Sequence, residues 1–552
     1  MGPIHSYQGA TEQADGKSKE TLPQFAQTVA AGEPSSKSKA PKKKSKHKKV
    51  IPEPYSGEFV VARDVENLLG QETVKEAIAG GTEWDAPFTG KEEIELIVSG
   101  LSSTGDSLSI APSPRKPWVI VTPLALPGEK IRVRVYRHAR LYSHADLLEV
   151  VTANPEWRDM TRVQCEYFGK CAGCQYQMLS YETQLQLKRN AVVKAYENFS
   201  GLLPSSISEI PETIGSPLQY GYRTKITPHF DALPRKLRKD TKHAFADSGA
   251  KPDWLRIGFN QIGTRQVMDI EECPIATPTL NEALPSIRQN VIQNAWTYKK
   301  GVSLLLRDSS TISTEPMTPI AVSVTQCDAI DGLAAPLEEH VCVTNHKATV
   351  RERVGDTLFE YTAGSFFQNN NSVLLPLTSY VRDAIFPPSP SFPTSAPTHL
   401  VDAYCGSGLF AITLAPYFQQ VAGIEISEES IRCATRNAEL NCLPMGRCKF
   451  MAGDAANIFA TVQDFPREHT ALIIDPPRKG TDEKFIDQLL QFNCATVVYV
   501  SCNVHTQARD VGMILRKSEQ RGGCKYVMQS LRGFDLFPQT AHVESVAVLR
   551  LV

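Results

Sequence analysis

The C-terminal part of the chain alternates short apolar runs with amphipathic stretches, and this pattern constrains the fold more than any other feature. The runs "HLVDA", "VAGIE", "TALIID" and "ATVVYVS" are rich in β-branched and aromatic residues, and a stretch typical of a helix follows each. The alternation predicts a doubly wound α/β sheet. Ligands of such sheets bind beside the carboxyl ends of the strands, so the residues after each run are the candidates for chemistry.

Three of these strand ends predict a site for a nucleoside-containing cofactor. Gly406 and Gly408 lie in "DAYCGSG", where glycines let the backbone approach a ligand and the next helix offers unpaired N–H groups. Glu425 ends the second strand, placed for the hydroxyls of a ribose, and Asp454 ends the third, near an adenine. The full G-x-G-x-x-G pattern is missing, which favours S-adenosylmethionine over a nicotinamide cofactor.

The fourth strand end reads "DPPRKG". Asp475 precedes two prolines, which predict a rigid exposed loop at the edge of the cofactor site. Amine methyltransferases carry an aromatic residue after a similar pair of prolines, and Arg478 occupies that position here. An exocyclic nitrogen is therefore disfavoured as the methyl acceptor.

The fifth strand ends on a cysteine, Cys502, in "YVSCNVHT". A pyrimidine C5 atom is too weak a nucleophile to attack a sulfonium methyl group, but a thiolate added at C6 turns the ring into an enolate that can attack. A base must then remove the C5 hydrogen, and Glu544 in "HVESV" fits that role. The alternative for Glu544 is a solvated strand residue.

A second group of cysteines, Cys165, Cys171 and Cys174, has the spacing C-x5-C-x2-C, and Cys273 can supply a fourth ligand. Four thiolates suit either an iron–sulfur cluster or zinc, and the spacing does not separate them. The odd total of 13 cysteines, without an apolar signal-peptide core, predicts a reducing compartment.

The 552 residues predict a multidomain α/β protein. We expect a disordered basic tail and linker at 1–86, an oligonucleotide-binding-like β-barrel at 87–160, a mixed α+β central domain with RNA contacts at 161–364, and a Rossmann-like S-adenosylmethionine-binding domain at 365–552.

The basic run Lys37–Lys49 is typical of a nuclear-import signal, of a nonspecific RNA-binding arm or of a plain solubilising tail. It predicts a location in the nucleus, the cytoplasm or both, with a mitochondrial location left open. The sequence contains no long apolar span, so we expect no membrane segment. Nothing in it indicates an obligate protein partner.

Taken together, "FFQNNN", "DAYCGSG", "GIEIS", "DPPRKG", "VSCN" and "HVESV" resemble the motifs of the RNA uracil-5 methyltransferases. "LPGEKIRVRV" resembles the TRAM module of that family, and the likeness runs from about residue 88 to the end of the chain. One departure is Leu409, where many relatives have Asn, so one side-chain contact to the cofactor is missing.

The resemblance implies a role for several side chains. Cys502 is the nucleophile and Glu544 the base, while the methyl donor is bound by Gln368, Tyr404, Glu425 and Asp475. The four cysteines match those that hold a [4Fe-4S] cluster in part of the family, which favours a structural cluster over zinc. Arg223 and Lys225 lie in "YGYRTKI", which resembles a segment that faces RNA, and with Arg478 they are the predicted RNA contacts.

The predicted function is methylation of uridine C5 in RNA by S-adenosylmethionine, at uridine 54 in the T loop of tRNA. A cytosine-5 RNA methyltransferase is one alternative, but it would normally carry a further cysteine in the Asp-Pro-Pro loop. The others are a ribosomal RNA uracil-5 methyltransferase and a non-catalytic tRNA-binding or chaperone protein.

Overall fold

A computed structural model describes residues 49–234, 250–311, 339–387, 396–453, 459 and 461–552. Most of the predicted basic run and Asp454 lie outside these residues. Lys49–Val552 form one structural unit. None of the helices described in it is both long enough and apolar enough to cross a membrane.

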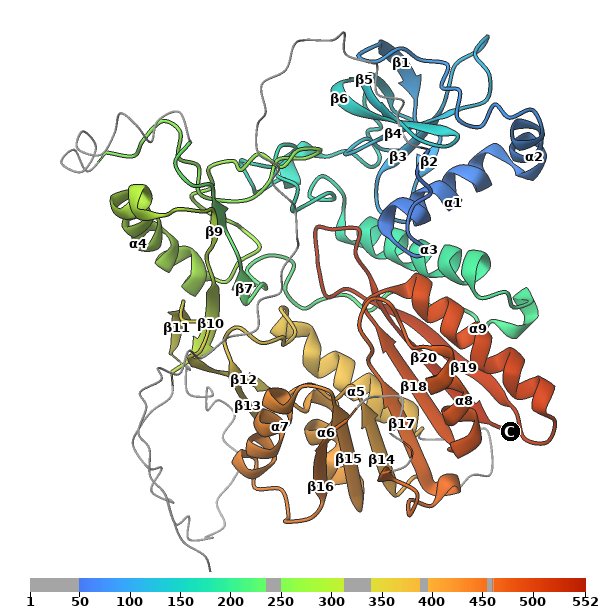
Figure 1. Cartoon of the computed structure of the whole chain (residues 1–552), viewed down its shortest axis with the longest axis vertical. Coiled ribbons are helices and arrows are strands. Elements are labelled where there is room, and N and C mark those ends of the chain that lie inside the picture. The colour runs from blue at the N-terminus through green and yellow to red at the C-terminus, as the bar shows by residue number, and fades with distance from the viewer. Residues whose placement is uncertain (1–48, 235–249, 312–338, 388–395, 454–458, 460) are drawn as a thin grey trace, which may run out of the picture. The chain divides into compact units, whose positions relative to one another are not determined.

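The C-terminal region builds a seven-stranded sheet, as the alternating pattern predicts. Its strands are β14 (His399–Ala403), β15 (Gln420–Glu425), β16 (Cys448–Ala452), β17 (Thr470–Ile474), β18 (Thr496–Ser501), β19 (Tyr526–Phe534) and β20 (Glu544–Leu551). They lie in the order β16-β15-β14-β17-β18-β20-β19 (Figure 1). The first five are parallel, whereas β20 is antiparallel to both β18 and β19.

Helices cover both faces of this sheet. They are α3 (Tyr181–Phe199), α5 (Leu374–Ile385), α6 (Leu409–Leu414), α7 (Glu428–Leu440), α8 (Glu483–Phe492) and α9 (Val504–Arg521). Residues of α3, α8 and α9 share one apolar core with one face of the strands, and residues of α5 and α6 share another with the opposite face. Every residue of β17 and β18 is buried, as expected for parallel strands covered on both sides.

Six strands form a second sheet near the N-terminal end, in the order β1-β5-β6-β4-β3-β2. They are β1 (Glu93–Ile97), β2 (Gly100–Leu101), β3 (Ser107–Ile110), β4 (Val119–Thr122), β5 (Lys130–His138) and β6 (Tyr142–Thr152). Strand β1 also contacts β3 near the opposite edge, so the sheet curls into a barrel. Ile131, Val133 and Val135 alternate inward on β5 and pack around the buried Trp118.

The segment before the barrel contains two helices, so the predicted disordered linker at 49–86 is wrong in this part. Helix α1 spans Gly57–Leu69 and α2 spans Gln71–Ala79. Val61 and Val65 of α1 bury against the outside of the barrel. Apolar residues of α1 recur at helical spacing between charged ones, and burial of that apolar face stabilises the helix.

The central region, predicted at 161–364, is divided between several small elements. They are α4 (Pro278–Asn294), β7 (Lys225–Ile226), β8 (His229–Phe230), β9 (Val302–Ser303), β10 (Leu306–Ser310), β11 (His340–Val343), β12 (Thr349–Val354) and β13 (Thr357–Thr362). Helix α3 comes from this part of the sequence but packs on the seven-stranded sheet. Lys188 of α3 makes a fully buried ion pair with Asp535, just after β19. The central and C-terminal regions therefore share a core.

Candidate active site

A cavity of about 780 Å³ lies at the carboxyl ends of the parallel strands, and we call it the strand-end cavity. Five residues singled out for cofactor binding line it, together with the predicted nucleophile Cys502: Gln368, Tyr404, Gly406, Glu425 and Asp475. Its volume lies within the range of small-molecule sites.

The glycine turn after β14 forms one wall of the strand-end cavity. Gly406 and Gly408 have positive φ angles of 54° and 94°, and Tyr404 has a φ of 65°. Gly408 begins α6, and a Cβ atom there would lie 2.6 Å from the Cδ1 atom of Ile412. Side chains larger than hydrogen are excluded at Gly408 both by backbone conformation and by space.

Glu425 is held at the end of β15 by two backbone groups. Its carboxylate accepts hydrogen bonds from the N–H of Gly406 at 3.3 Å and from the N–H of Ser427 at 3.0 Å. The bond to Gly406 joins the acid to the glycine turn of the neighbouring strand. A carboxylate fixed in this way is preorganised to accept hydrogen bonds from a ligand.

Two exposed apolar side chains of this cavity escaped the sequence analysis. Phe366 is 74% exposed and Ile426 is 75% exposed, although both line the strand-end cavity. Ile426 follows Glu425 directly, and Phe366 begins the quoted "FFQNNN" motif. Ile426 could have been predicted as a cavity residue, because it is an apolar residue directly after Glu425, the acid predicted to bind a ribose. Leu409, the noted departure from the family pattern, lies in the same wall.

Cys502 lies in the short link between β18 and α9, at the helix N-terminus. In the antiparallel pairing of β18 with β20, Val500 is opposite Val546 and Ser501 is opposite Ser545. Cys502 follows Ser501 and Glu544 precedes Ser545, and the carboxyl group of Glu544 lies near enough to act on the pKa of the Cys502 thiol. The structure thus brings together two side chains that the sequence separates widely.

The surroundings of Cys502 and Glu544 favour the protonated form of both side chains, and also that of Asp475. Burial, together with the nearby carboxyl groups of Glu544 and Asp475, raises the pKa of the Cys502 thiol to about 12. Burial raises the pKa of Glu544 to about 8 and that of Asp475 to about 7. The Arg478 guanidinium acts in the opposite direction on Cys502 and Glu544. Two carboxyl groups therefore exchange protons near neutral pH, as general acid–base catalysis requires.

The Asp-Pro-Pro loop is fastened to the start of α9. The carbonyl oxygen of Arg478 accepts hydrogen bonds from Asn503 Nδ2 at 3.0 Å and from Thr506 Oγ1 at 3.2 Å. Asp510 of α9 is fully buried, and it accepts hydrogen bonds from the Thr481 N–H at 2.8 Å and the Tyr499 hydroxyl at 2.6 Å. The loop, the nucleophile's strand and its helix are therefore held as one piece.

A second cavity of about 780 Å³ also reaches Cys502, and we call it the outer cavity. Cys502, Arg478 and Lys479 line both cavities. The walls of the outer cavity include His505 and His542, whose pKa values burial lowers to about 4. Because Cys502 lines both cavities, a ligand in either one can contact its thiol.

The other two predicted RNA contacts lie elsewhere. Arg223 donates a hydrogen bond from Nε to the carbonyl oxygen of Lys225 at 3.0 Å, and its guanidinium lies 5.7 Å from the centre of the Phe537 ring. Neither Arg223 nor Lys225 is among the residues lining the two cavities at Cys502. Of the three predicted RNA contacts, the structure places only Arg478 beside the nucleophile.

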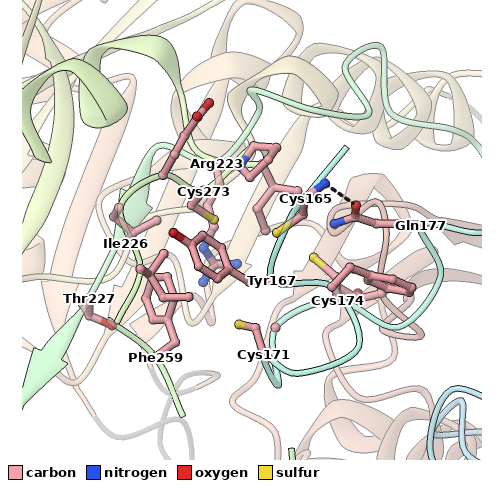
Figure 2. Close-up of a pocket in the computed structure, with 17 residues that line it drawn as sticks. Cys165, Tyr167, Cys171, Cys174, Gln177, Arg223, Ile226, Thr227, Phe259 and Cys273 are labelled. Atoms are coloured by element: carbon pink, nitrogen blue, oxygen red, sulfur yellow. Dashed lines mark hydrogen bonds between the residues drawn. The ribbon is translucent and has the colours of Figure 1, made fainter. Parts of the chain in front are cut away.

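The four predicted metal ligands surround a third cavity of about 260 Å³. Figure 2 shows the sulfur atoms of Cys165, Cys171, Cys174 and Cys273 around one space, although Cys273 comes from a distant part of the chain. Burial raises the pKa of all four thiols. Within the described residues, no three His, Cys, Asp or Glu side chains are arranged to hold a metal ion.

The sequence of this chain is similar to those of known tRNA methyltransferases. A family model described as tRNA (uracil-5-)-methyltransferase matches residues 338–551. The tRNA (uracil(54)-C(5))-methyltransferase of Schizosaccharomyces pombe is 42% identical over 509 residues, which cover 92% of this chain and 86% of that protein. Its namesake in Saccharomyces cerevisiae is 38% identical, over 84% of this chain and 74% of that protein.

Among solved structures, the Pyrococcus abyssi tRNA (uracil-54, C5)-methyltransferase in complex with S-adenosyl-L-homocysteine resembles this chain with a TM-score of 0.54. The two are 23% identical, and the match covers 82% of this chain and 99% of that one. This likeness shows a common fold.

Proposed function

The chain belongs to the tRNA (uracil-5-)-methyltransferase family, and from this premise we propose that it methylates C5 of uridine 54 in the tRNA T loop. The observation that carries the proposal is the position of Cys502, which lines two cavities and lies near the carboxyl group of Glu544. A C5 methylation through a covalent adduct needs a methyl donor on one side of the nucleophile, a pyrimidine on the other and a base within reach.

S-adenosylmethionine fits the strand-end cavity. Glu425 accepts hydrogen bonds at the site expected for the ribose hydroxyls, and the glycine turn leaves room for the methionine part of the donor. The exposed apolar side chains of Phe366 and Ile426 are suited to cover an adenine ring. When bound there, the donor supplies an electrophilic methyl group on a sulfonium.

The outer cavity is the proposed place of the target uridine, which must leave its stack to reach Cys502. The carboxylate of Asp475 takes the proton of the Cys502 thiol, which leaves Glu544 ionised, and the Cys502 sulfur adds to C6 of the uracil. A sulfur–carbon bond forms, and the electrons of the C5–C6 double bond move to the O4 oxygen. The position of the thiol at the start of α9 supports this step, because helix N-terminal N–H groups stabilise a thiolate.

The enolate C5 atom then forms a bond to the methyl carbon, and the sulfonium carbon–sulfur bond breaks. Glu544, in its ionised form, removes the C5 proton. The C5–C6 double bond forms again, and Cys502 leaves as the thiolate. A Glu544 pKa of about 8 suits this role, because a carboxylate of raised pKa is a stronger base than an exposed one.

The β-barrel is proposed as a TRAM-type RNA-binding module. Its size and strand order are compatible with oligonucleotide-binding barrels, and the loop residues Ser103 and Thr104 line the outer cavity beside Cys502. Barrel and catalytic sheet would then hold the same RNA.

The cysteine cavity is proposed to hold a [4Fe-4S] cluster with a structural role. Four thiols surround a space far larger than one ion requires. A zinc ion needs its ligands within bonds of about 2.3 Å, and no three potential ligands among the described residues are arranged to hold a single ion. Anaerobically purified protein should contain iron and acid-labile sulfide, and Cys174→Ser should lose both. Stoichiometric zinc without sulfide would contradict the proposal.

The function is tested with methyl-labelled S-adenosylmethionine, an unmodified tRNA transcript and a matched transcript with cytidine at position 54. We expect 5-methyluridine from the first transcript and no labelled product from the second. Product in ribosomal RNA, 5-methylcytidine, or tRNA binding without transfer would each favour one of the alternative functions.

Glu544→Gln gives a direct test of the base. If Glu544 removes the C5 proton, this variant should accumulate a protein–RNA adduct that survives a denaturing gel. Cys502→Ala in the same background should abolish the adduct. A Glu544→Gln protein that turns over normally would assign the base elsewhere.

A further inference from the structure

One wall of the outer cavity comes from the short segment Glu53–Gly57, which leads into the first residue of α1, and we call it the wall segment. All five of its residues line the cavity that also contains Cys502. The segment is more than 400 positions away from the nucleophile in the sequence, and a linker was expected in its place. Its presence at the reactive thiol calls for a physical explanation.

The wall segment has a defined conformation. The N–H of Ser56 donates to the carbonyl oxygen of Glu53 at 3.1 Å, which closes a turn around Pro54 and Tyr55. The Ser56 hydroxyl then caps α1 by accepting from the N–H of Phe59 at 3.3 Å. Tyr55 has a φ of 62°, which is uncommon for an aromatic residue and persists only where its surroundings fix it.

The surroundings of Tyr55 are aromatic and cationic. The Arg509 guanidinium of α9 lies 4.8 Å from the centre of the Tyr55 ring. The rings of Phe59 and Phe199 lie 5.8 Å and 5.7 Å away. Phe199 in turn makes an edge contact of 5.3 Å with His505, another residue of the outer cavity. The Tyr55 ring is thus held by residues of α1, α3 and α9, and α9 is the helix that begins next to Cys502.

The same cavity gathers positive charge. Arg478, Lys479 and Arg509 line it, against a single carboxylate from Glu53. Arg478 and Lys479 are exposed, while Tyr55 is only half-buried. Aromatic rings combined with cationic side chains form the usual site for unstacked nucleotides, because bases stack on the rings and phosphates pair with the cations.

We propose that Tyr55 is a substrate-binding residue, on which a base of the opened RNA loop stacks while the target uridine reaches Cys502. The inference rests on the proposed function and deepens it, because it assigns the wall segment to the RNA site. The Tyr55 ring replaces part of the base stacking that the RNA loses when the uridine leaves the loop.

The test compares Tyr55→Ala, Tyr55→Leu and Tyr55→Phe in steady-state methylation of the tRNA transcript. Removal of one base–aromatic stack should raise KM for tRNA between about 5-fold and 100-fold, with KM for S-adenosylmethionine within about twofold of the wild type. Leu keeps apolar contact with Phe59 and Phe199 but cannot stack, so it should behave like Ala. Phe keeps the ring and should restore KM to within about threefold.

Tyr417→Ala is the matched control. Tyr417 is 50% exposed and carries the guanidinium of Arg382 at 5.7 Å from its ring centre, but it lines neither cavity at Cys502. This variant should keep the KM of the wild type for tRNA. An unchanged KM in Tyr55→Ala, or full recovery in Tyr55→Leu, would overturn the proposal.

A binding measurement separates this inference from the proposed function. Filter binding of the transcript to Cys502→Ala protein, with and without Tyr55→Ala, reports stacking without any chemistry. We expect Tyr55→Ala to raise the Kd for the transcript by the same factor by which it raises KM for tRNA. If the wild type transfers no methyl group but Tyr55→Ala still weakens binding, the proposed reaction fails and the role of Tyr55 stands. Equal Kd values would remove Tyr55 from the RNA site.

Discussion

The buried carboxyl group of Glu544 should make the stability of the protein depend on pH in a way that one substitution removes. Its pKa of about 8 in the folded chain lies above the usual value of 4.5, so the folded state holds more protons than the unfolded state between these two pH values. The free energy of unfolding of the wild type therefore falls as pH rises through this window and levels off above it.

The size of this effect follows from the two pKa values. Their difference corresponds to about 5 kcal/mol, at about 1.36 kcal/mol per pKa unit. Part of the shift comes from Asp475, whose own pKa is about 7, so the two carboxyl groups titrate as a pair and share the cost. As the pH rises from 5 to 9, we therefore expect the free energy of unfolding of Glu544→Gln to increase by about 2 to 4 kcal/mol relative to that of the wild type.

Thermal unfolding followed by circular dichroism at a series of pH values measures this gain. At about 1 °C per kcal/mol for a unit of this size, the Tm of Glu544→Gln should move up by roughly 2 to 4 °C relative to the wild type between pH 5 and pH 9. Glu468→Gln, a change at an exposed glutamate, provides the control and should follow the wild type. Parallel pH profiles for Glu544→Gln and the wild type would refute the reasoning.

Three further outcomes test the site and its support. Cys502→Ala should abolish methyl transfer but leave the Kd for S-adenosylmethionine, measured by equilibrium dialysis, within about twofold; retained turnover would exclude the covalent route. Glu425→Ala removes a carboxylate that accepts hydrogen bonds, so KM for S-adenosylmethionine should rise about 10-fold to 100-fold; an unchanged KM would place the ribose elsewhere. Lys188→Met leaves Asp535 charged and buried, which should cost about 3 to 5 kcal/mol in urea denaturation. The double variant with Asp535→Leu should recover most of that loss, and a single variant of wild-type stability would contradict the role of the ion pair.

The parallel sheet was predictable because its strands are buried on both faces and read as continuous apolar runs. For the same reason the positions of Glu425 and Asp475 at strand ends followed from the pattern. Their roles in binding remain predictions, as do those of Cys502 and Glu544.

The contacts between distant segments could not be predicted in this way. Cys502 lies near Glu544 only because β20 inserts beside β18, and no local pattern encodes that choice of neighbour. The wall segment at Tyr55 was missed because its surroundings, not its own composition, hold it in place. Arg223 was predicted to contact RNA because its segment resembles one that faces RNA in the family, and a resemblance of sequence did not show that its side chain lines the cysteine cavity.

The final strand of the sheet along the chain is an inner strand in space. Since β20 lies between β18 and β19, every shorter version of this polypeptide that stops before Glu544 leaves β19 without its neighbour and one edge of β18 unpaired. Bare strand edges pair readily with other molecules. Premature stop codons late in the gene should therefore yield aggregates that cells clear, instead of weakly active enzyme.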